Sequence, residues 1–73
     1  MTDKKFAYLY NGTERQITVG TSDTIERMQG GNTHIHYAGT EEELAEDVHP
    51  YYKQEYIVTM ANRLHDFEDK LFL

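Results

Sequence analysis

Aromatic and aliphatic residues recur at every second position in the first part of the chain, a period typical of β-strands. The stretch KKFAYLYNGTERQITV contains Asn11-Gly12, a dipeptide favoured at the centre of a two-residue hairpin turn because both residues tolerate positive φ. A hairpin with this loop pairs Tyr10 with Thr13 and Phe6 with Ile17. The expected core face of the hairpin is its aromatic face, which carries Phe6, Tyr8, Tyr10, Ile17 and Val19.

A second alternating stretch, NTHIHYA at residues 32–38, predicts a third strand. We expect it to pair with the hairpin and to complete a small antiparallel sheet. The alternation sets Ile35 and Tyr37 towards the helices and leaves His34 and His36 facing out.

Capping signals predict two helices. The stretch TSDTIERMQGG favours a short helix that Ser22 or Asp23 caps and that the glycine pair ends. In GTEEELAEDVH, Thr40 is an expected N-cap and Glu43 completes a capping box. Pro50 is expected to end or break this second helix.

From Pro50 onwards the apolar residues recur at intervals of three and four, which predicts one longer C-terminal helix. Its apolar stripe would contain Tyr52, Tyr56, Met60, Leu64, Phe67 and Leu71. Tyr51 and Tyr52 cannot both point inward on such a helix, so one of them is expected at the surface. The order of elements predicts a single small α+β domain over residues 1–73, with the antiparallel sheet packed against two C-terminal helices.

Composition narrows the function classes. The chain has 73 residues and a formal net charge of −6, from 13 acidic and 7 basic residues. Phosphate-backbone binders need clustered lysine and arginine, so direct nucleic-acid binding is not expected. There is no cysteine, which excludes a disulfide or a thiolate zinc site. No apolar run is long enough for a signal peptide or a membrane span, so the expected location is cytoplasmic.

The two alternating histidines are the strongest candidate for metal chemistry. A His-x-His pair on a strand can bring two imidazoles to one metal ion, but a stable site needs further ligands. His49, His65 or the carboxylates of residues 41–47 would have to supply these ligands, and no spacing indicates that they do. We therefore expect His34 and His36 to lie at the surface, and we expect no metal and no cofactor.

Signals of catalysis are weaker still. The chain has one serine, Ser22, and it sits where a helix cap is expected rather than in a nucleophile motif. Paired carboxylates need a cleft that gives them different environments, and so small a domain offers little room for one. The glycine pair lacks the Gly-Lys-Ser/Thr sequence of a phosphate loop. The chain is therefore not expected to be an enzyme.

Six tyrosines and three phenylalanines favour a role in protein binding, because tyrosine combines a large apolar ring with one polar tip. The hairpin is the expected contact element, and its candidate residues are Lys4, Lys5, Tyr8, Tyr10 and Arg15. Tyr8 is also a core position in the same pattern. The five acids within residues 41–47 would steer the molecule towards a basic surface, and the terminal DKLFL adds an apolar candidate contact.

In its length, its opening MTDKKFAYLYNGTERQ and its acidic composition, the whole chain resembles the small RNA-polymerase-binding transcription regulators of Xanthomonas phages. No diagnostic motif carries the resemblance, so no residue role is transferred from it. It implies a non-enzymatic protein in the cytoplasm of the host bacterial cell. Such a protein binds host RNA polymerase, notably the N-terminal part of the β′ subunit, inhibits transcription initiation and promotes antitermination.

Other function classes remain open at this point. The acidic residues also fit an inhibitor that mimics nucleic acid and targets a host nuclease or defence protein. The histidine pair also fits a small metal-binding protein or metalloenzyme. A structural protein would self-associate, whereas we expect this chain to be a monomer.

Overall fold

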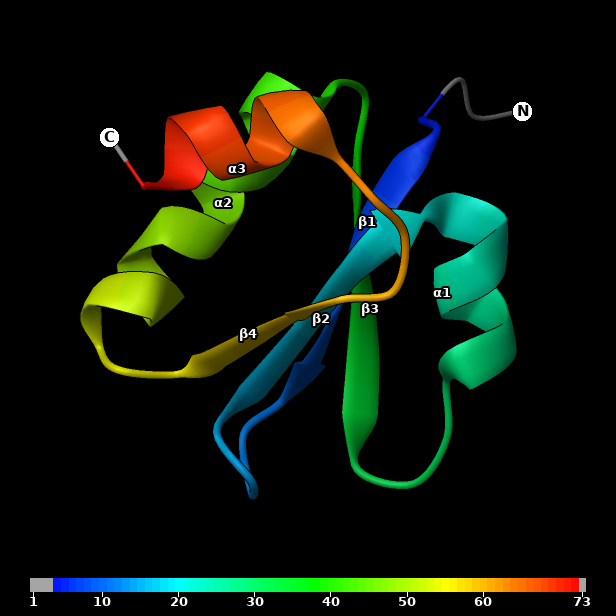
Figure 1. The fold of residues 1–73 in the computed structure, drawn as a ribbon. Coiled ribbons are helices and arrows are strands. Elements are labelled where there is room, and N and C mark those ends of the chain that lie inside the picture. The colour runs from blue at the N-terminus through cyan, green and yellow to red at the C-terminus, as the bar shows by residue number, and fades with distance from the viewer. Residues whose placement is uncertain (1–3, 73) are drawn as a thin grey trace.

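The chain folds into a four-stranded mixed sheet with helices on both of its faces (Figure 1). This computed structural model describes residues 4–72. Across the sheet the strand order is β3-β1-β2-β4; β1 is antiparallel to both β2 and β3, and β4 runs parallel to β2. Along the chain the elements are β1 (Phe6–Asn11), β2 (Gln16–Thr21), α1 (Ser22–Met28), β3 (Thr33–Ala38), α2 (Glu41–Lys53), β4 (Ile57–Met60) and α3 (His65–Leu71). The predicted α+β class is confirmed.

The N-terminal hairpin forms, but its register differs from the prediction. Tyr10 pairs with Ile17 and Tyr8 pairs with Val19, so the loop spans residues 12–15 rather than two residues. The predicted two-residue loop is therefore wrong. Each partner has moved by four positions along β2, and an even shift keeps every side chain on its expected face. The predicted aromatic core face is consequently confirmed.

Local hydrogen bonding explains the longer loop. The Asn11 side-chain oxygen accepts a hydrogen bond from the Glu14 N–H at 3.0 Å, which folds the chain back on itself after β1. Arg15 then adopts a positive φ of 53° and leads into β2. Asparagine thus acts here through its side chain, rather than as the first residue of a two-residue turn.

The two faces of the sheet pack against different helices (Figure 1). α2 and α3 cover the aromatic face and form the main core, which contains Tyr8, Ile17, Val19, Ala38, Leu44, Ala45, Val48, Leu64, Phe67 and Leu71. α1 covers the opposite face, where Ile25 packs with Ala7 and Leu9. Ile35 and Tyr37 join this smaller cluster, so the helix that they face is α1.

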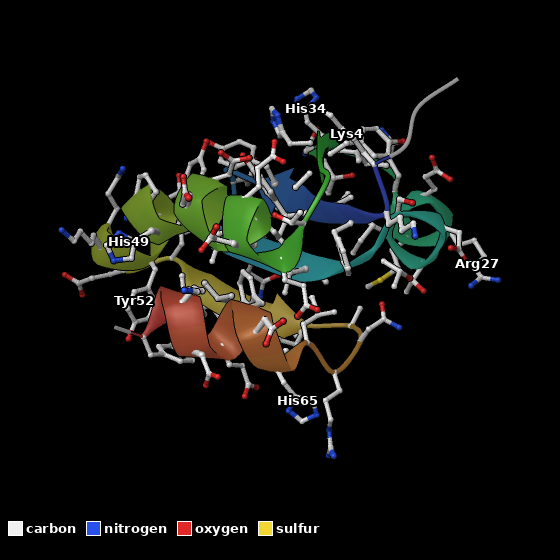
Figure 2. All side chains as sticks on the ribbon, turned by 90° about the horizontal axis from the view of Figure 1, so that it is seen from above. Lys4, Arg27, His34, His49, Tyr52 and His65 are labelled. Atoms are coloured by element: carbon white, nitrogen blue, oxygen red, sulfur yellow. The ribbon has the colours of Figure 1, made fainter. Side chains whose placement is uncertain are left out.

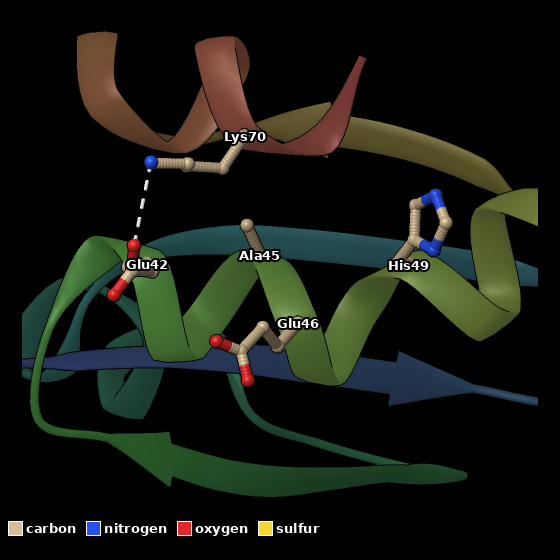
Figure 3. Close-up of a pocket in the computed structure, with 5 residues that line it drawn as sticks. All are labelled: Glu42, Ala45, Glu46, His49 and Lys70. Carbon is tan, nitrogen blue, oxygen red and sulfur yellow. Dashed lines mark ion pairs between the residues drawn. The ribbon is translucent and has the colours of Figure 1, made fainter. Parts of the chain in front are cut away.

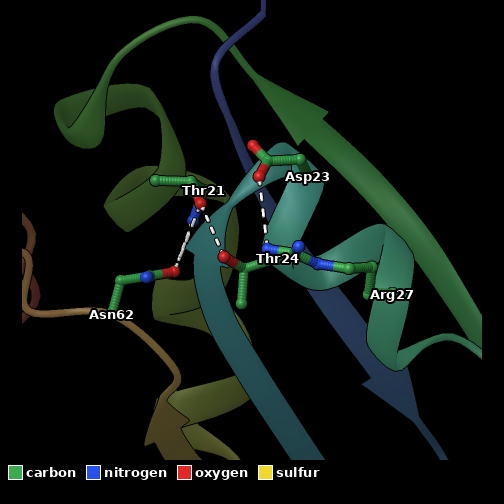
Figure 4. Close-up of polar contacts among 5 residues, drawn as sticks. All are labelled: Thr21, Asp23, Thr24, Arg27 and Asn62. Atoms are coloured by element: carbon green, nitrogen blue, oxygen red, sulfur yellow. Dashed lines mark hydrogen bonds and ion pairs between the residues drawn. The ribbon is translucent and has the colours of Figure 1, made fainter.

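α1 begins without the expected cap. Its N-cap residue is Thr21, which makes no side-chain capping bond, and the helix ends at Met28 before the glycine pair. The Thr21 N–H instead donates to the Asn62 side-chain oxygen at 2.9 Å (Figure 4). This bond ties the end of β2 to the segment between β4 and α3.

α2 begins at the predicted N-cap, Thr40, but Glu43 binds the N–H of the residue before the cap rather than that of the cap itself, and the helix does not end as predicted. The Thr40 hydroxyl accepts a hydrogen bond from the Glu43 N–H at 3.0 Å, and the Glu43 carboxylate accepts one from the Gly39 N–H at 3.0 Å. The helix then passes through Pro50 and ends at Lys53. Pro50 is exposed in the last turns of this helix. The buried residues before it pack against the core, so the helix tolerates the N–H that proline lacks. The prediction that Pro50 ends the helix is wrong.

The predicted long C-terminal helix is also wrong, because the chain forms β4 and the short helix α3 instead. α2 ends at Lys53, and two residues later Glu55 adopts a φ of +68° that turns the chain out of the helix. The Glu55 N–H donates to the Tyr52 carbonyl at 3.1 Å and the Tyr56 N–H donates to the Tyr51 carbonyl at 3.0 Å, the two bonds of a Schellman motif. The β-branched residues that follow favour an extended strand.

Among residues 4–72, no helix has both the length and the apolar character that a bilayer crossing requires.

Candidate protein-binding face

Three half-buried tyrosine rings meet where the end of β1, the end of α2 and the start of β4 come together. The ring centroids of Tyr10 and Tyr51 are 5.4 Å apart, those of Tyr51 and Tyr56 5.2 Å, and those of Tyr10 and Tyr56 6.0 Å. The hydroxyl groups of Tyr10 and Tyr56 lie 3.4 Å apart. Together with their exposed neighbours they form a surface that we call the tyrosine face, consisting of Tyr10, Arg15, His34, His36, Tyr51 and Tyr56.

Arg15 is exposed on this face and is held by three contacts. Its guanidinium carbon lies 4.5 Å from the centroid of the Tyr56 ring, within the range of a cation–π interaction. The guanidinium also donates to the Gln54 carbonyl at the end of α2. The Arg15 carbonyl accepts a hydrogen bond from the Ile57 N–H at 3.0 Å. The hairpin loop is thereby fixed against the end of α2 and the start of β4.

The two histidines are exposed, as predicted. The expectation that they face away from the C-terminal helices is wrong, because they share the aromatic face of the sheet, which packs against α2 and α3. His36 pairs with Tyr8 in the sheet, and the rings of the two residues stack with centroids 5.0 Å apart and an angle of 18°. His34 lies opposite Tyr10 in the register of the two strands. The histidines remain accessible because β3 is an edge strand.

The histidines are not gathered into a metal site. No group of three or more histidine, aspartate or glutamate side chains within residues 4–72 is placed to hold a metal ion. Figure 2 shows His34, His49 and His65 at separate places on the surface. The further ligands considered from the sequence are therefore not supplied by His49 or His65.

A hollow of about 340 Å³ lies between α2 and α3 and is lined by Glu42, Ala45, Glu46, His49 and Lys70 (Figure 3). The Lys70 ammonium lies 3.3 Å from the Glu42 carboxylate. Both side chains are about half exposed, so water screens the pair and it contributes little to stability. No polar or charged residue in the described part of the chain is buried. The charges of this hollow are thus solvated rather than enclosed.

The five residues predicted for protein contact do not lie together. Tyr10 and Arg15 belong to the tyrosine face. Tyr8 is 5% exposed and lies in the core beneath that face. Lys4 and Lys5 are exposed at the opposite end of β1, and Lys5 borders a different hollow.

Tyr51 and Tyr56 lie on the tyrosine face but are not among the contact residues predicted from the sequence. Tyr51 is half-buried and Tyr52 is 41% exposed, so the expectation that one of the neighbouring tyrosines reaches the surface is confirmed. The position of Tyr56 depends on the end of α2 at Lys53 and on the start of β4. No local pattern in the sequence indicated either boundary.

Burial and hydrogen bonding raise the pKa of two tyrosines in this region, Tyr8 and Tyr10. Burial, with smaller effects of Tyr51 and Asp47, raises the pKa of Tyr8 above its usual range. The hydrogen bond with Tyr56 raises the pKa of Tyr10. The Tyr10 hydroxyl is therefore a neutral group that can donate and accept hydrogen bonds, which suits a contact with another protein.

A second apolar surface lies near the C-terminus. Tyr52 and Phe72 are 41% and 60% exposed, and their ring centroids are 5.3 Å apart. Leu71 is buried, so one side of the terminal segment packs against the core and the other is open. Leu73 lies outside the described residues.

No protein-family model, curated protein or solved structure matches the chain.

Proposed function

We propose that the chain acts without catalysis, as a regulator that binds another protein through the tyrosine face. The observation that carries the proposal is the ordered group of half-exposed tyrosines with Arg15 stacked on Tyr56. Tyrosine and arginine are the residues enriched at the energetic centres of protein interfaces. Here they are already held in place, so binding loses little side-chain entropy.

The proposed partner is host bacterial RNA polymerase, bound at the N-terminal part of its β′ subunit. Support comes from the likeness of the opening MTDKKFAYLYNGTERQ and of the acidic composition to phage transcription regulators. The net charge of −6 suits association with a basic protein surface. Binding would inhibit initiation and promote antitermination by favouring one conformation of the polymerase over another.

The test is the affinity of labelled variants for RNA polymerase core enzyme from a Xanthomonas host. Tyr10→Ala and Arg15→Ala should each weaken binding by roughly fivefold or more, which corresponds to about 1 kcal/mol. Arg63→Ala is the matched control, because Arg63 is exposed on the segment between β4 and α3. Circular dichroism verifies the fold of each variant. Wild-type affinity of both folded variants would contradict the assignment of this face.

An acidic inhibitor that mimics nucleic acid is the second candidate. The observation that favours it is a row of exposed carboxylates on α2, contributed by Glu42, Glu43, Glu46 and Asp47. This function predicts that DNA competes with the chain for its partner and that binding weakens steeply with salt. Binding to the polymerase that duplex DNA does not displace would favour the first candidate.

A further inference from the structure

The free edge of β3 exposes backbone groups whose positions follow from the hairpin. The Ser22 N–H donates to the Lys5 carbonyl at 2.8 Å, and these two residues extend the register of β1 and β2. In an antiparallel ladder, hydrogen-bonded pairs alternate with non-bonded pairs. The odd-numbered residues of β1 therefore bond to β2, and the even-numbered ones bond to β3.

The even-numbered residues of β1 face His34, His36 and Ala38 in the sheet. The backbone N–H and C=O groups of these three residues are thus directed at β1. The other three residues of β3, Thr33, Ile35 and Tyr37, direct their backbone N–H and C=O groups away from the sheet. No strand within residues 4–72 lies beside this outer edge of β3.

This edge lacks the features that usually prevent strand addition. β3 contains no lysine, arginine, aspartate, glutamate or proline, and all six of its residues pair in sequence with β1 without a bulge. Natural edge strands are commonly protected by charges, proline, bulges or short length. The opposite edge strand, β4, has four residues. β3 is therefore the longer and less protected template for another strand.

Carboxylates flank this edge on both faces of the sheet. On the α1 side, the Glu26 carboxylate accepts a hydrogen bond from the Tyr37 hydroxyl at 2.6 Å. On the α2 side, the carboxylate of Glu43 binds the Gly39 N–H just after β3, and Asp47 lies near Tyr8, the neighbour of His36. A second copy of the chain would bring another net charge of −6, which opposes pairing between copies.

We propose that the partner protein presents an extended, basic segment that adds to the sheet as a strand beside β3. This inference rests on the proposed function, since it specifies how the partner is held. Backbone hydrogen bonds to Ile35 and Tyr37 supply the pairing, and alternate side chains of the added strand lie on the two faces. Those on one face reach His34 and His36 at the border of the tyrosine face, and those on the other lie on the side of Glu26.

The first test uses a synthetic peptide of alternating lysine and valine, roughly eight residues long. Its matched control alternates glutamate and valine. In the free chain, amide exchange measured by NMR should be fast at Ile35 and Tyr37 and slow at His34 and His36. The basic peptide should slow exchange at the two outward amides by about tenfold or more, and the acidic peptide should not. Protection of these amides in the free chain, or no protection by the basic peptide at millimolar concentration, would overturn the proposal.

The second test removes the backbone N–H of Ile35, which points away from the sheet. Ile35→Pro lacks the N–H, and proline is tolerated on an edge strand where that group faces solvent. Ile35→Ala loses a similar amount of packing on α1 but keeps the N–H, so it is the control. Ile35→Pro should bind the basic peptide and the polymerase about tenfold more weakly than Ile35→Ala. If circular dichroism shows that Ile35→Pro does not fold, a synthetic chain with an N-methylated Ile35 takes its place.

The outcomes separate the two proposals. If the polymerase binds wild type, Ile35→Ala and Ile35→Pro equally, strand addition is wrong although protein binding stands. If the polymerase does not bind wild type, the proposed function fails, and the peptide titration alone decides whether β3 accepts a strand.

Discussion

Replacing Glu55 with glycine is expected to stabilise the fold, because Glu55 ends α2 with a backbone conformation that suits glycine. Its φ is +68°, and its exposed side chain is placed away from the core. The two Schellman bonds at this corner come from backbone groups, so the substitution leaves them in place.

The magnitude follows from two opposing effects. The left-handed conformation costs a residue with a Cβ atom about 1–2 kcal/mol relative to glycine. Glycine gives the unfolded chain extra conformational freedom, which destabilises the fold by about 0.4–1 kcal/mol. The net gain is about 0.5–1 kcal/mol, equivalent to a rise of roughly 2–8 °C in the thermal midpoint of a domain of this size.

Urea unfolding followed by circular dichroism measures the change. Gln54→Gly is the matched control, because Gln54 is the adjacent residue and has a negative φ of −89°. That variant gains no relief of strain and should lose about 0.5–1 kcal/mol. If Glu55→Gly is no more stable than wild type, or loses as much as Gln54→Gly, the strain assigned to Glu55 is absent. Binding through the tyrosine face should be unchanged in Glu55→Gly, since Tyr56 keeps its backbone bond to Tyr51.

Two further changes test the core and the sheet. Gly20→Ala should destabilise the fold by about 1–2 kcal/mol, because a Cβ there would lie 2.5 Å from the Asn62 side-chain oxygen that holds the end of β2. Gly30→Ala, with no atom within 4 Å of the new Cβ, is the control, and equal losses of urea stability in both would contradict the steric explanation. Tyr8→Phe should make the fold less sensitive to alkaline pH. Burial raises the pKa of Tyr8 above 10.0, so the stability that its neutral hydroxyl contributes is present below about pH 10. Above that pH this stability is lost at up to about 1.4 kcal/mol per pH unit. Urea midpoints that fall equally in wild type and Tyr8→Phe between about pH 9 and pH 11 would show that Tyr8 does not cause the loss.

Sequence patterns predicted the parts of the fold that depend on near neighbours. The hairpin and β3 arise from alternation, and the start of α2 arises from capping, all within a few residues. α1 forms where it was predicted, but without the predicted cap. The C-terminal half was mispredicted because residues four apart lie on one face of a strand as well as on one face of a helix. Tyr56 and Met60 are four residues apart across β4, and Phe67 and Leu71 are four residues apart on α3. The pattern thus identified Tyr56, Met60, Leu64, Phe67 and Leu71 as core residues while giving part of them the wrong element. Its prediction for Tyr52 is wrong, because Tyr52 is exposed and Tyr51 packs against the core instead.

The error in the hairpin loop and the error at the end of α2 have one physical origin. Arg15 reaches the Gln54 carbonyl and Tyr56 because the loop spans residues 12–15, and its own carbonyl accepts the first hydrogen bond of β4 from Ile57. With a two-residue loop, Arg15 would lie opposite Tyr8 within the sheet, and this junction would not form. The longer loop and the added strand therefore stabilise each other across some forty positions of sequence. The tyrosine face is the surface of that junction, which is why local patterns indicated Tyr10 and Arg15 as contact residues but not Tyr56.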